Sequence, residues 1–361
     1  MNLNASIQKI VSLEPIPKSD RIQIATLEGM AWITVVKKDQ FKVGDMVVFI
    51  AIDTELPETP WSEFLRHSKF RVKTQRIRGV LSQGLTMPLD EILMGVTLPS
   101  GNPVSQIEST LDGVILNGDT LLPLNTEIGH LIGVKHYEKP VPGAHLGGEM
   151  QGNFPSSVRK TYETNIKGCT AILSEMLGKD AYITVKCDGT SSTFAHIDNV
   201  RYVCGRNWAY KESETNVYWQ MYHKYNIQKI FASEPDNLAI QGEICGPGIH
   251  HRNRLQLKEL QLFVFDVFNP STGRYLGYPE LEDFCDKHGL QMVPLLTTLT
   301  VDESMLDLSF WMDLVKGNYK GTENRREGIV VRSTVPGYSR RVGNRLSFKV
   351  LNDDFLEKDE D

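Results

Sequence analysis

Lys186 is the residue whose position most suggests chemistry. Residues 185–194 read VKCDGTSSTF, so Lys186 ends a run of β-branched residues and Asp188-Gly189 follows at once. The plain interpretation is a β-hairpin with Asp-Gly at its turn. A free lysine has a pKa of about 10.4 and is a poor nucleophile at neutral pH. A partly desolvated lysine beside cations or a metal ion can lose its proton and attack a phosphate.

A lysine that attacks the α-phosphate of a nucleotide needs company of defined types. It needs carboxylates for a divalent metal ion, cations for the phosphates and an aromatic wall for the base. The chain supplies these types in CGRNW, QGEICGPG, LFVFDVF, REGIVVR and RLSFKVLN, as Arg206, Glu243, Phe265, Glu327 and Lys349 respectively. Singly, each has a plain alternative: a solvated strand end, a core aromatic or a surface charge. Their order along the chain after Lys186 favours one shared site.

These segments resemble the motifs of the covalent nucleotidyltransferases, the superfamily of ATP-dependent DNA and RNA ligases and RNA capping enzymes. KCDGTS resembles motif I, CGRN motif Ia, QGEICGPG motif III, LFVFDVF motif IIIa, EGIVVR motif IV and SFKV motif V. The resemblance covers residues 156–352. Just before motif I, residues 155–166 (PSSVRKTYETNI) resemble the segment that helps to frame the adenine in RNA ligases.

The resemblance implies a role for each matching residue. Lys186 would take AMP, Asp188 would organise the lysine, and Lys349 would hold the α-phosphate. The residues implied to bind the nucleotide are Glu163, Lys186, Arg206, Glu243, Phe265, Glu327 and Lys349. The residues implied to hold Mg²⁺ or Mn²⁺ are Asp188, Glu243 and Glu327. Motif V is commonly K-x-K, but here its first position is Ser347, so Lys349 would carry the phosphate charge alone or with Arg345.

The remaining sequence indicates the elements that position these residues. Residues 1–95 contain short strand-like runs, among them 22–27, 46–50 and 80–85, separated by turn residues, and this spacing predicts a small β-barrel. From residue 156 strand-like and helix-like runs alternate, with helices predicted at 166–176 and 216–232. Residues 96–155 are rich in Gly and Pro, which predicts a connecting segment.

The position of the motifs narrows the family. DNA ligases and capping enzymes typically carry an OB-fold domain after motif V, whereas only 12 residues follow Lys349. We therefore expect the second domain to precede motif I, as in the RNA ligases with an N-terminal OB-fold. The expected protein is α+β. It has an OB-fold β-barrel at 1–95, a connecting segment at 96–155, and an adenylyltransferase domain of antiparallel sheets and helices, of the ATP-grasp-like ligase type, at 156–361.

A basic stretch in the N-terminal part suits nucleic acid. Residues 63–79 read EFLRHSKFRVKTQRIRG and hold six cations against one carboxylate. The cations are Arg66, Lys69, Arg71, Lys73, Arg76 and Arg78. On an OB barrel such a stretch would meet a phosphate backbone. The alternative is a solvated edge strand whose charges prevent aggregation.

Composition sets the remaining limits. The net charge is −6, with 40% hydrophobic and 23% charged residues, which is ordinary for a globular protein. Five cysteines without zinc-site spacing indicate reduced thiols. The first residues, MNLNASIQKI, do not fit the pattern of a secretory signal, and no apolar run is long enough to span a membrane. We expect a monomer in the cytoplasm or nucleus, and a viral protein made in either place would look the same.

The resemblance thus implies an ATP-dependent RNA ligase that uses ATP with Mg²⁺ or Mn²⁺. It would seal 3′-OH and 5′-phosphate ends through a lysyl-AMP intermediate and an adenylylated 5′ end. Its expected partner is RNA or a nicked duplex with RNA on the 3′-OH side. Two alternatives stay open at this point: a capping-type guanylyltransferase, and an RNA-binding module with an inactive transferase fold.

Overall fold

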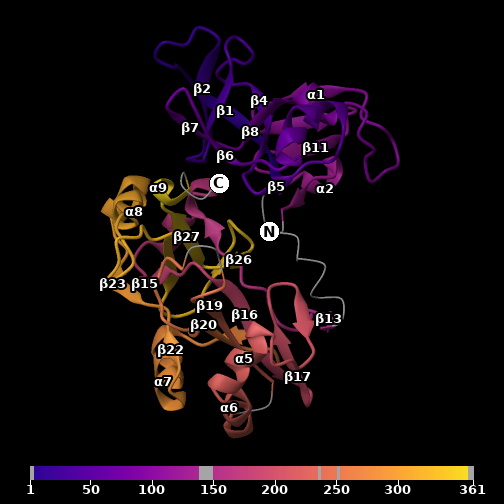
Figure 1. Ribbon diagram of the computed structural model, residues 1–361. Helices are drawn as coiled ribbons and strands as arrows, with labels where there is room; N and C mark the ends of the chain where they lie inside the picture. The colour runs from indigo at the N-terminus through magenta and orange to yellow at the C-terminus, as the bar shows by residue number, and fades with distance from the viewer. Residues whose placement is uncertain (1–3, 138–148, 235–236, 250–252, 357–361) are drawn as a thin grey trace. The chain divides into compact units, whose positions relative to one another are not determined.

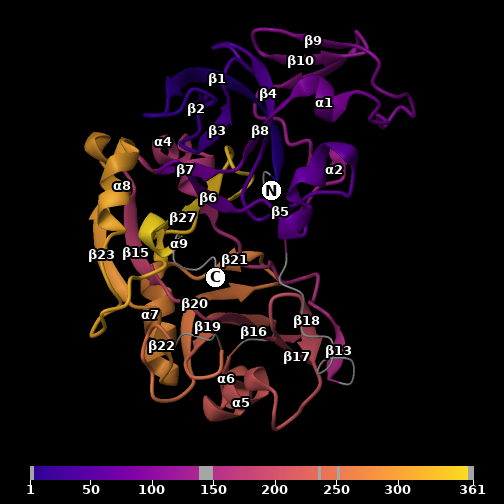
Figure 2. The ribbon, with the colours of Figure 1, turned by 45° about the horizontal axis from the view of Figure 1, so that its top comes forward.

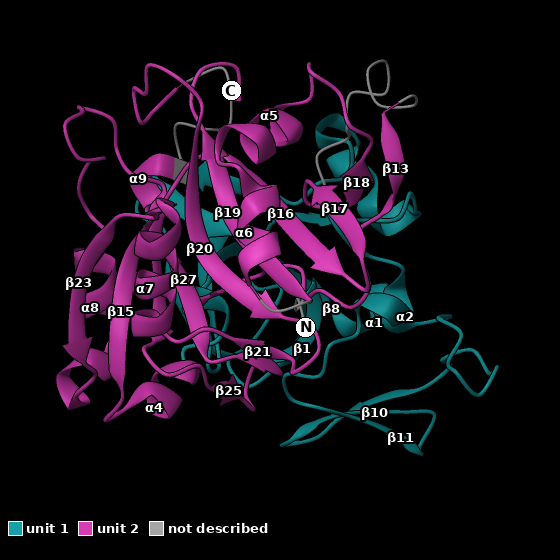
Figure 3. Ribbon diagram, turned by 90° about the horizontal axis from the view of Figure 1, so that it is seen from below, with its two compact units in different colours: residues 1–139, 166–171, 360 teal, residues 140–165, 172–359, 361 magenta. Residues whose placement is uncertain are grey.

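The computed structural model describes residues 4–137, 149–234, 237–249 and 253–356 (Figure 1). The chain forms two compact units, shown in different colours in Figure 3. Among the described residues, unit 1 holds 4–137 and 166–171, and unit 2 holds 149–165 and the residues from 172 onward. Each unit has its own sheets and hydrophobic clusters. Both units contain strands together with short helices, and the fold is α+β.

Unit 1 is built on an antiparallel sheet with the strand order β3-β2-β1-β4-β8 (Figure 2). Its strands are β1 (Ala5–Pro15), β2 (Ile22–Leu27), β3 (Ile33–Lys37), β4 (Met46–Ile50) and β8 (Leu85–Pro88). The first half of β1 pairs with β4 and the second half with β2, and the pairing with β2 has a register shift between Ile10 and Ser12. The hydroxyls of Thr34 and Thr86 hydrogen-bond at 2.7 Å and join β3 to β8. The sheet therefore curls into the OB-fold that the sequence predicts.

One predicted strand, 80–85, is divided in two. β7 (Val80–Gln83) forms a hairpin with β6 (Thr74–Ile77), and β8 starts at Leu85. Between β7 and β8, Gly84 has a φ of +113°, and a Cβ there would lie 2.5 Å from Phe49 Cε2. Only glycine fits this corner, which is why the strand breaks there.

Residues 96–137, which the sequence suggests as part of a connecting segment, instead add to unit 1. They form β9 (Ile107–Ser109), β10 (Gly113–Leu116), β11 (Thr120–Pro123), α2 (Gly129–Ile132) and β12 (Lys135–His136). The other elements of unit 1 are β5 (Thr54–Glu55), η1 (Pro60–Ser68), α1 (Leu89–Leu93) and η2 (Ile166–Gly168). Val104, Val114 and Ile128 belong to the same buried cluster as Ala5 and Ile7. This apolar burial, hidden among glycines and prolines in the sequence, is what makes the segment structural.

Unit 2 contains two main sheets. The β19 sheet comprises, in order, β13 (Met150–Asn153), β18 (Trp208–Tyr210), β17 (Val200–Cys204), β16 (Thr190–Ile197), β19 (Leu238–Cys245), β20 (Gln261–Asn269) and β21 (Arg274–Tyr275), with β22 (Gln291–Met292) beside β20. The β15 sheet comprises β14 (Thr164–Asn165), β27 (Ser347–Leu351), β24 (Gly328–Ser333), β15 (Asp180–Lys186) and β23 (Leu295–Thr300). A small hairpin joins β25 (Tyr338–Ser339) to β26 (Asn344–Arg345).

The helices of unit 2 are short. They are α4 (Ile172–Met176), α5 (Val217–Lys224), α6 (Ile227–Ser233), α7 (Tyr278–His288), η3 (Glu303–Leu306), α8 (Leu308–Leu314) and α9 (Asp353–Leu356). The single helix predicted at 216–232 is two helices, because Asn226 adopts a left-handed φ of +49° between α5 and α6. The helix predicted at 166–176 begins only at residue 172, after the turn η2 in unit 1. Among the described residues, no helix has the length and apolarity needed to cross a membrane.

The faces of the two sheets decide where a site can form. Phe194, Ile240 and Val264 share a cluster with residues of α5, α6 and α7. Of these helices, α5 and α6 are seen over one face of the β19 sheet in Figure 3. On the β15 sheet, Phe348 packs against Trp311 of α8, with ring centroids 5.1 Å apart. Strand alternation sends the neighbours of these residues to the opposite faces. The remaining face of the β15 sheet is joined to the remaining face of the β19 sheet by an ion pair between Arg332 and Asp266. The candidate site lies between these two faces.

Candidate active site

Lys186 and Lys349 lie on the same face of the β15 sheet. Lys186 pairs with Gly328 of β24, while Thr184 pairs with Val330, which in turn pairs with Lys349 of β27. Directly paired residues share a face, and so do residues two apart on one strand. The register of β15, β24 and β27 therefore places both lysines on one surface of the sheet, one pleat apart along the strands.

The ammonium group of Lys186 forms an ion pair with Glu327. Lys186 Nζ lies 2.6 Å from Glu327 Oε1, and the two side chains are 29% and 19% exposed. Burial acts to lower the pKa of Lys186, but the carboxylates of Glu327, Glu243 and Asp188 act together against it, and the pKa is raised above that of an ordinary lysine. Without bound cations the lysine is thus held protonated, so it is stored in a non-nucleophilic form.

Glu243 occupies the adjoining position on the β19 sheet. It pairs with Ser191 of β16 and Phe263 of β20. Burial raises the pKa of Glu243 to about 8, against the opposing effect of Lys186, and the carboxylates of Glu327 and Asp188 add to the rise. Arg206, an exposed residue just after β17, lowers this pKa and is therefore within electrostatic reach. The structure thus brings Lys186, Glu243 and Glu327 together, with Arg206 nearby.

Gly189 allows the Lys186 turn to approach β19. A Cβ on Gly189 would lie 2.6 Å from Cys245 Sγ and 2.8 Å from Glu243 Cγ, and it would also strike the carbonyl oxygen of Ile244. Any larger residue would push the turn away from Glu243. The hairpin expected at this turn is wrong, because β15 and β16 belong to different sheets and do not pair, and the Asp188-Gly189 turn instead connects the two sheets. Its glycine is a packing requirement of the site.

Tyr319 is a site residue that the sequence did not reveal. Its hydroxyl donates to the carbonyl oxygen of Lys186 at 3.1 Å and accepts from the backbone N–H of Glu327 at 3.1 Å. The side chain is 4% exposed, and burial followed by the charge of Glu327 raises its pKa, so the hydroxyl stays protonated. Tyr319 fixes the backbone of both members of the central ion pair. It lies in an irregular segment before motif IV, where no periodicity marks it.

Phe265, the expected base-stacking residue, is the extra residue of a β-bulge. Gln241 pairs with Asp266 and Gly242 with Val264, so Phe265 has no partner on β19. Arg332 of β24 donates to the carbonyl oxygen of Phe265 at 2.8 Å, and its guanidinium lies 5.7 Å from the ring centroid. The bulge re-aims the ring and Arg332 holds it in place.

Arg332 belongs to a buried ionic network. It contacts Glu163 at 2.7 Å and Asp266 at 3.3 Å, and Arg345 also pairs with Asp266. Burial opposes the charge on Arg332, but Asp266 and Glu163 hold its pKa well above the usual range. Charges this buried are tolerated only when paired. Strand alternation in the sequence could have identified Arg332, because it lies two residues after Val330 and therefore on the same face of β24.

The serine that replaces the first lysine of motif V makes a specific hydrogen bond in the structure. Ser347, at the position where a lysine is common, donates its hydroxyl proton to Glu163, whose other oxygen accepts from Arg332. Both oxygens of Glu163 are therefore engaged, and the side chain is 10% exposed. Lys349 Nζ lies 5.2 Å from the ring centroid of Tyr162. Arg345, the residue suggested to assist Lys349, has its Nη1 on Asp266.

The carboxylates have the donor chemistry for a divalent metal ion but do not form a ready cage. Within the described ranges no three His, Cys, Asp or Glu side chains are arranged to hold a metal ion. Mg²⁺ usually keeps several waters and binds one or two carboxylates together with substrate phosphates. Glu243 and Glu327 fit that mode, whereas the carboxylate of Asp188 also lies 3.3 Å from Arg254 Nε.

The six cations of the basic stretch in unit 1 differ in how they are engaged. Arg66 pairs with Glu63 at 2.6 Å, and Arg71 pairs with Asp53 at 2.5 Å. The exposed members are Arg66, Lys69, Arg76 and Arg78, whereas Arg71 and Lys73 are partly buried. Carboxylates thus partly neutralise the stretch, and its role in binding nucleic acid stays a prediction.

Two models of known protein families match this chain. A family model described as RNA ligase matches residues 179–351, which include Lys186, Glu243, Glu327 and Lys349. A model of an OB-fold domain matches residues 4–89. A search of curated protein sequences finds no match.

Solved structures extend the likeness to the whole chain. A structure of Naegleria gruberi RNA ligase with PPi has a TM-score of 0.79 and 26% identity, and the match covers 100% of this chain and 99% of that one. A mutant of the same enzyme with AMP and Mn has a TM-score of 0.80, and another mutant with ATP and Mn has 0.77, both at 26% identity with 100% of each chain covered.

Replacing Tyr319 by phenylalanine tests its role as the backbone clamp. Tyr319→Phe leaves the Lys186 carbonyl and the Glu327 N–H without their shared partner, so we expect a loss of about 1–3 kcal/mol in the free energy of unfolding. Urea denaturation measures it. Tyr338→Phe, at a tyrosine that is 64% exposed, is the matched control and should be neutral. Equal stability of the two variants would contradict the clamp.

The raised pKa of Glu243 predicts how stability depends on pH. Between the ordinary value of 4.5 and about 8 the folded state holds a proton on Glu243 that the unfolded state releases, so the free energy of unfolding falls as pH rises. Glu243→Gln removes this dependence. In metal-free buffer its stability relative to wild type should rise by on the order of 1 kcal/mol per pH unit from about pH 5 to about pH 8. A constant difference between the two denaturation series would refute the shift.

Proposed function

Since this chain belongs to the RNA ligase family, in the group with an N-terminal OB-fold domain, we propose that it joins RNA ends with ATP through a lysyl-AMP on Lys186. One observation carries the proposal. Lys186, at the end of β15, forms an ion pair with Glu327, lies in the field of Glu243 and Asp188, and shares a sheet face with Lys349.

The reaction we propose has three phosphoryl transfers. The amine of Lys186 attacks the α-phosphorus of ATP, so an N–P bond forms, the bond to the β-phosphate oxygen breaks and pyrophosphate leaves. A 5′-phosphate oxygen of RNA then attacks the same phosphorus and frees the lysine, which gives an adenylylated end. Finally the 3′-OH attacks the 5′-phosphate, closes the phosphodiester bond and releases AMP with the proton of the hydroxyl.

The residues of this chain would divide the work of the first transfer. Glu327 and Tyr319 orient Lys186, one through its ammonium group and the other through its carbonyl oxygen. Phe265 would stack on the adenine, which suits a flat base, and Lys349 would neutralise charge that develops on the α-phosphate. Lys186 must lose its proton before it attacks, because its pKa is raised in the ligand-free site.

A divalent ion would complete this site. Glu243 and Glu327, assisted by Asp188, would hold Mg²⁺ or Mn²⁺, in line with the related structures that contain Mn with ATP or AMP. Its charge would offset the carboxylates that keep Lys186 protonated and would stabilise negative charge on the phosphate oxygens. Glu243 would give up its proton on binding, since a carboxylate ligand is deprotonated.

For the substrate we propose a nick in a duplex with RNA on the 3′-OH side, in agreement with the family resemblance. The exposed cations of unit 1, among them Lys69, Arg76 and Arg78, would contact the phosphate backbone.

The test is covalent labelling. The protein is incubated with α-labelled ATP or GTP and Mg²⁺ or Mn²⁺, denatured and resolved on a gel. We expect label from ATP only, and its complete loss in Lys186→Ala because no other group replaces the nucleophile. Lys179→Ala, at an exposed lysine one residue before β15, is the matched control and should label like wild type.

The other outcomes are equally informative. Label from GTP alone would indicate a capping-type guanylyltransferase. No label from either nucleotide would favour an RNA-binding module with an inactive transferase fold. Label that survives in Lys186→Ala would refute the assignment of the nucleophile.

A further inference from the structure

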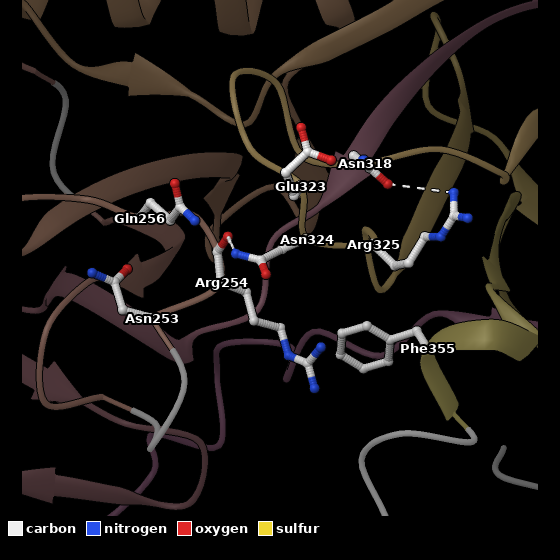
Figure 4. Close-up of a pocket in the computed structure, with 8 residues that line it drawn as sticks. All are labelled: Asn253, Arg254, Gln256, Asn318, Glu323, Asn324, Arg325 and Phe355. Atoms are coloured by element: carbon white, nitrogen blue, oxygen red, sulfur yellow. Dashed lines mark hydrogen bonds between the residues drawn. The ribbon is translucent and has the colours of Figure 1, made fainter.

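A polar cavity of about 640 Å³ opens in unit 2 (Figure 4). It is lined by four carboxamides, two guanidinium groups, one carboxylate and one aromatic ring: Asn253, Gln256, Asn318, Asn324, Arg254, Arg325, Glu323 and Phe355. Its volume falls in the range of ligand sites, which is roughly 300–1,000 Å³. The lining has far more hydrogen-bonding groups than a site for an apolar ligand would need.

The cavity adjoins the catalytic end of the β15 sheet. Three segments line it: the loop between β19 and β20, the loop that leads to Glu327 and β24, and α9, which follows β27. β24 starts at Gly328, which pairs with Lys186 of β15 on one side. On its other side Gly328 pairs with Leu351, the last residue of β27. Arg332, which holds Phe265 through its carbonyl oxygen, pairs with Tyr182 of β15. Tyr182 lies four residues, or two pleats, before Lys186 on the same strand. Along the strands, the order is therefore the Phe265 wall, then Lys186, then the cavity.

Arg254 connects the cavity to the Lys186 turn. Its side chain is 8% exposed, its guanidinium lies 4.3 Å from the centroid of the Phe355 ring, and its Nε lies 3.3 Å from Asp188 Oδ2. Asn324 donates to the carbonyl oxygen of Arg254 at 2.8 Å. Arg254 is thus held on both its side chain and its backbone, and it shares a charge pair with motif I.

Arg325 is the exposed cation at the cavity. Its Nη1 lies 3.4 Å from Asn318 Oδ1, a long contact made by one of its five N–H donors (Figure 4). The two segments that carry these residues are joined by a bridge between Asn318 and Arg325. Arg325 is thereby fixed through its backbone while its guanidinium remains exposed to solvent.

We propose that this cavity binds a phosphodiester of the RNA strand next to the reacting end, with Arg325 as the phosphate contact and the carboxamides on the sugar and base edges. The proposal rests on the RNA ligase function proposed above. Guanidinium groups bind phosphate through paired N–H donors, and side-chain amides donate to and accept from sugars and bases. The cavity would hold the strand in register with Lys186.

Charge favours RNA over the β- and γ-phosphates of ATP. The lining carries two arginines against Glu323, and Arg254 is already paired with Asp188. Among the described residues Arg325 has a hydrogen bond to Asn318 but no ion pair, and one such guanidinium matches a diester, which has a single negative charge per nucleotide. A pyrophosphate group carries several negative charges and would be repelled by Glu323.

The test separates the first transfer from the joining of RNA. Arg325→Gln is compared with wild type and with Arg274→Gln, a matched control at another exposed arginine in unit 2 that does not line the cavity. Lysyl-AMP formation is measured with labelled ATP alone. Joining is measured without ATP on a nicked duplex with a pre-adenylylated 5′ end, over a range of nick and salt concentrations.

We expect Arg325→Gln to form lysyl-AMP like wild type and to need about tenfold more nick for half-maximal joining. Its affinity should fall less steeply with salt, by about one unit in the log–log slope, because one phosphate contact is lost. Joining equal to that of Arg274→Gln would overturn the proposal. So would a defect confined to lysyl-AMP formation, which would assign the cavity to ATP. A wild-type protein that takes no label would instead refute the function itself.

Discussion

The ion pair between Lys186 and Glu327 is the interaction on which the rest of unit 2 depends. A lysine must be buried enough to meet a nucleotide away from bulk water, yet burial alone would strip its charge. Here three carboxylates more than offset burial, so the ammonium group is stable in the ligand-free protein. The site therefore keeps its nucleophile protonated, and the arrival of positive charge at the carboxylates is what would release it.

The surrounding structure can be understood as support for that pair. Tyr319 joins the backbones of Lys186 and Glu327, and Gly189 lets the motif I turn lie against Glu243. Further inward, the bulge at Phe265 is held by Arg332, whose own charge is balanced by buried carboxylates. Removing one partner from such a network costs about 3–5 kcal/mol, because an unpaired buried charge is left behind. The geometry at the lysine thus rests partly on polar contacts made by Arg332 of the neighbouring strand β24.

The sequence predicted those parts of the structure that depend on local pattern. The family, the N-terminal OB-fold and the α+β class were confirmed, because ordered motifs and strand periodicity are encoded locally. It did not predict the break at Asn226, where a left-handed residue divides one helical pattern, or the packing of residues 96–137 into unit 1. Nor could it identify Tyr319 or the engagement of Glu163 with Arg332 and Ser347, since contacts across sheets leave no periodic signal. The roles of the individual site residues stay predictions.

The central claim, that carboxylates hold Lys186 protonated until cations bind, is tested most directly by NMR titration of this lysine. The side-chain carbon next to the amine is followed in lysine-labelled protein and assigned by its loss in Lys186→Ala. We predict a pKa above the ordinary value of 10.5 in the ligand-free protein and a fall on adding Mg²⁺ with an ATP analogue that cannot transfer AMP. A pKa at or below the ordinary value in the ligand-free protein would contradict the account.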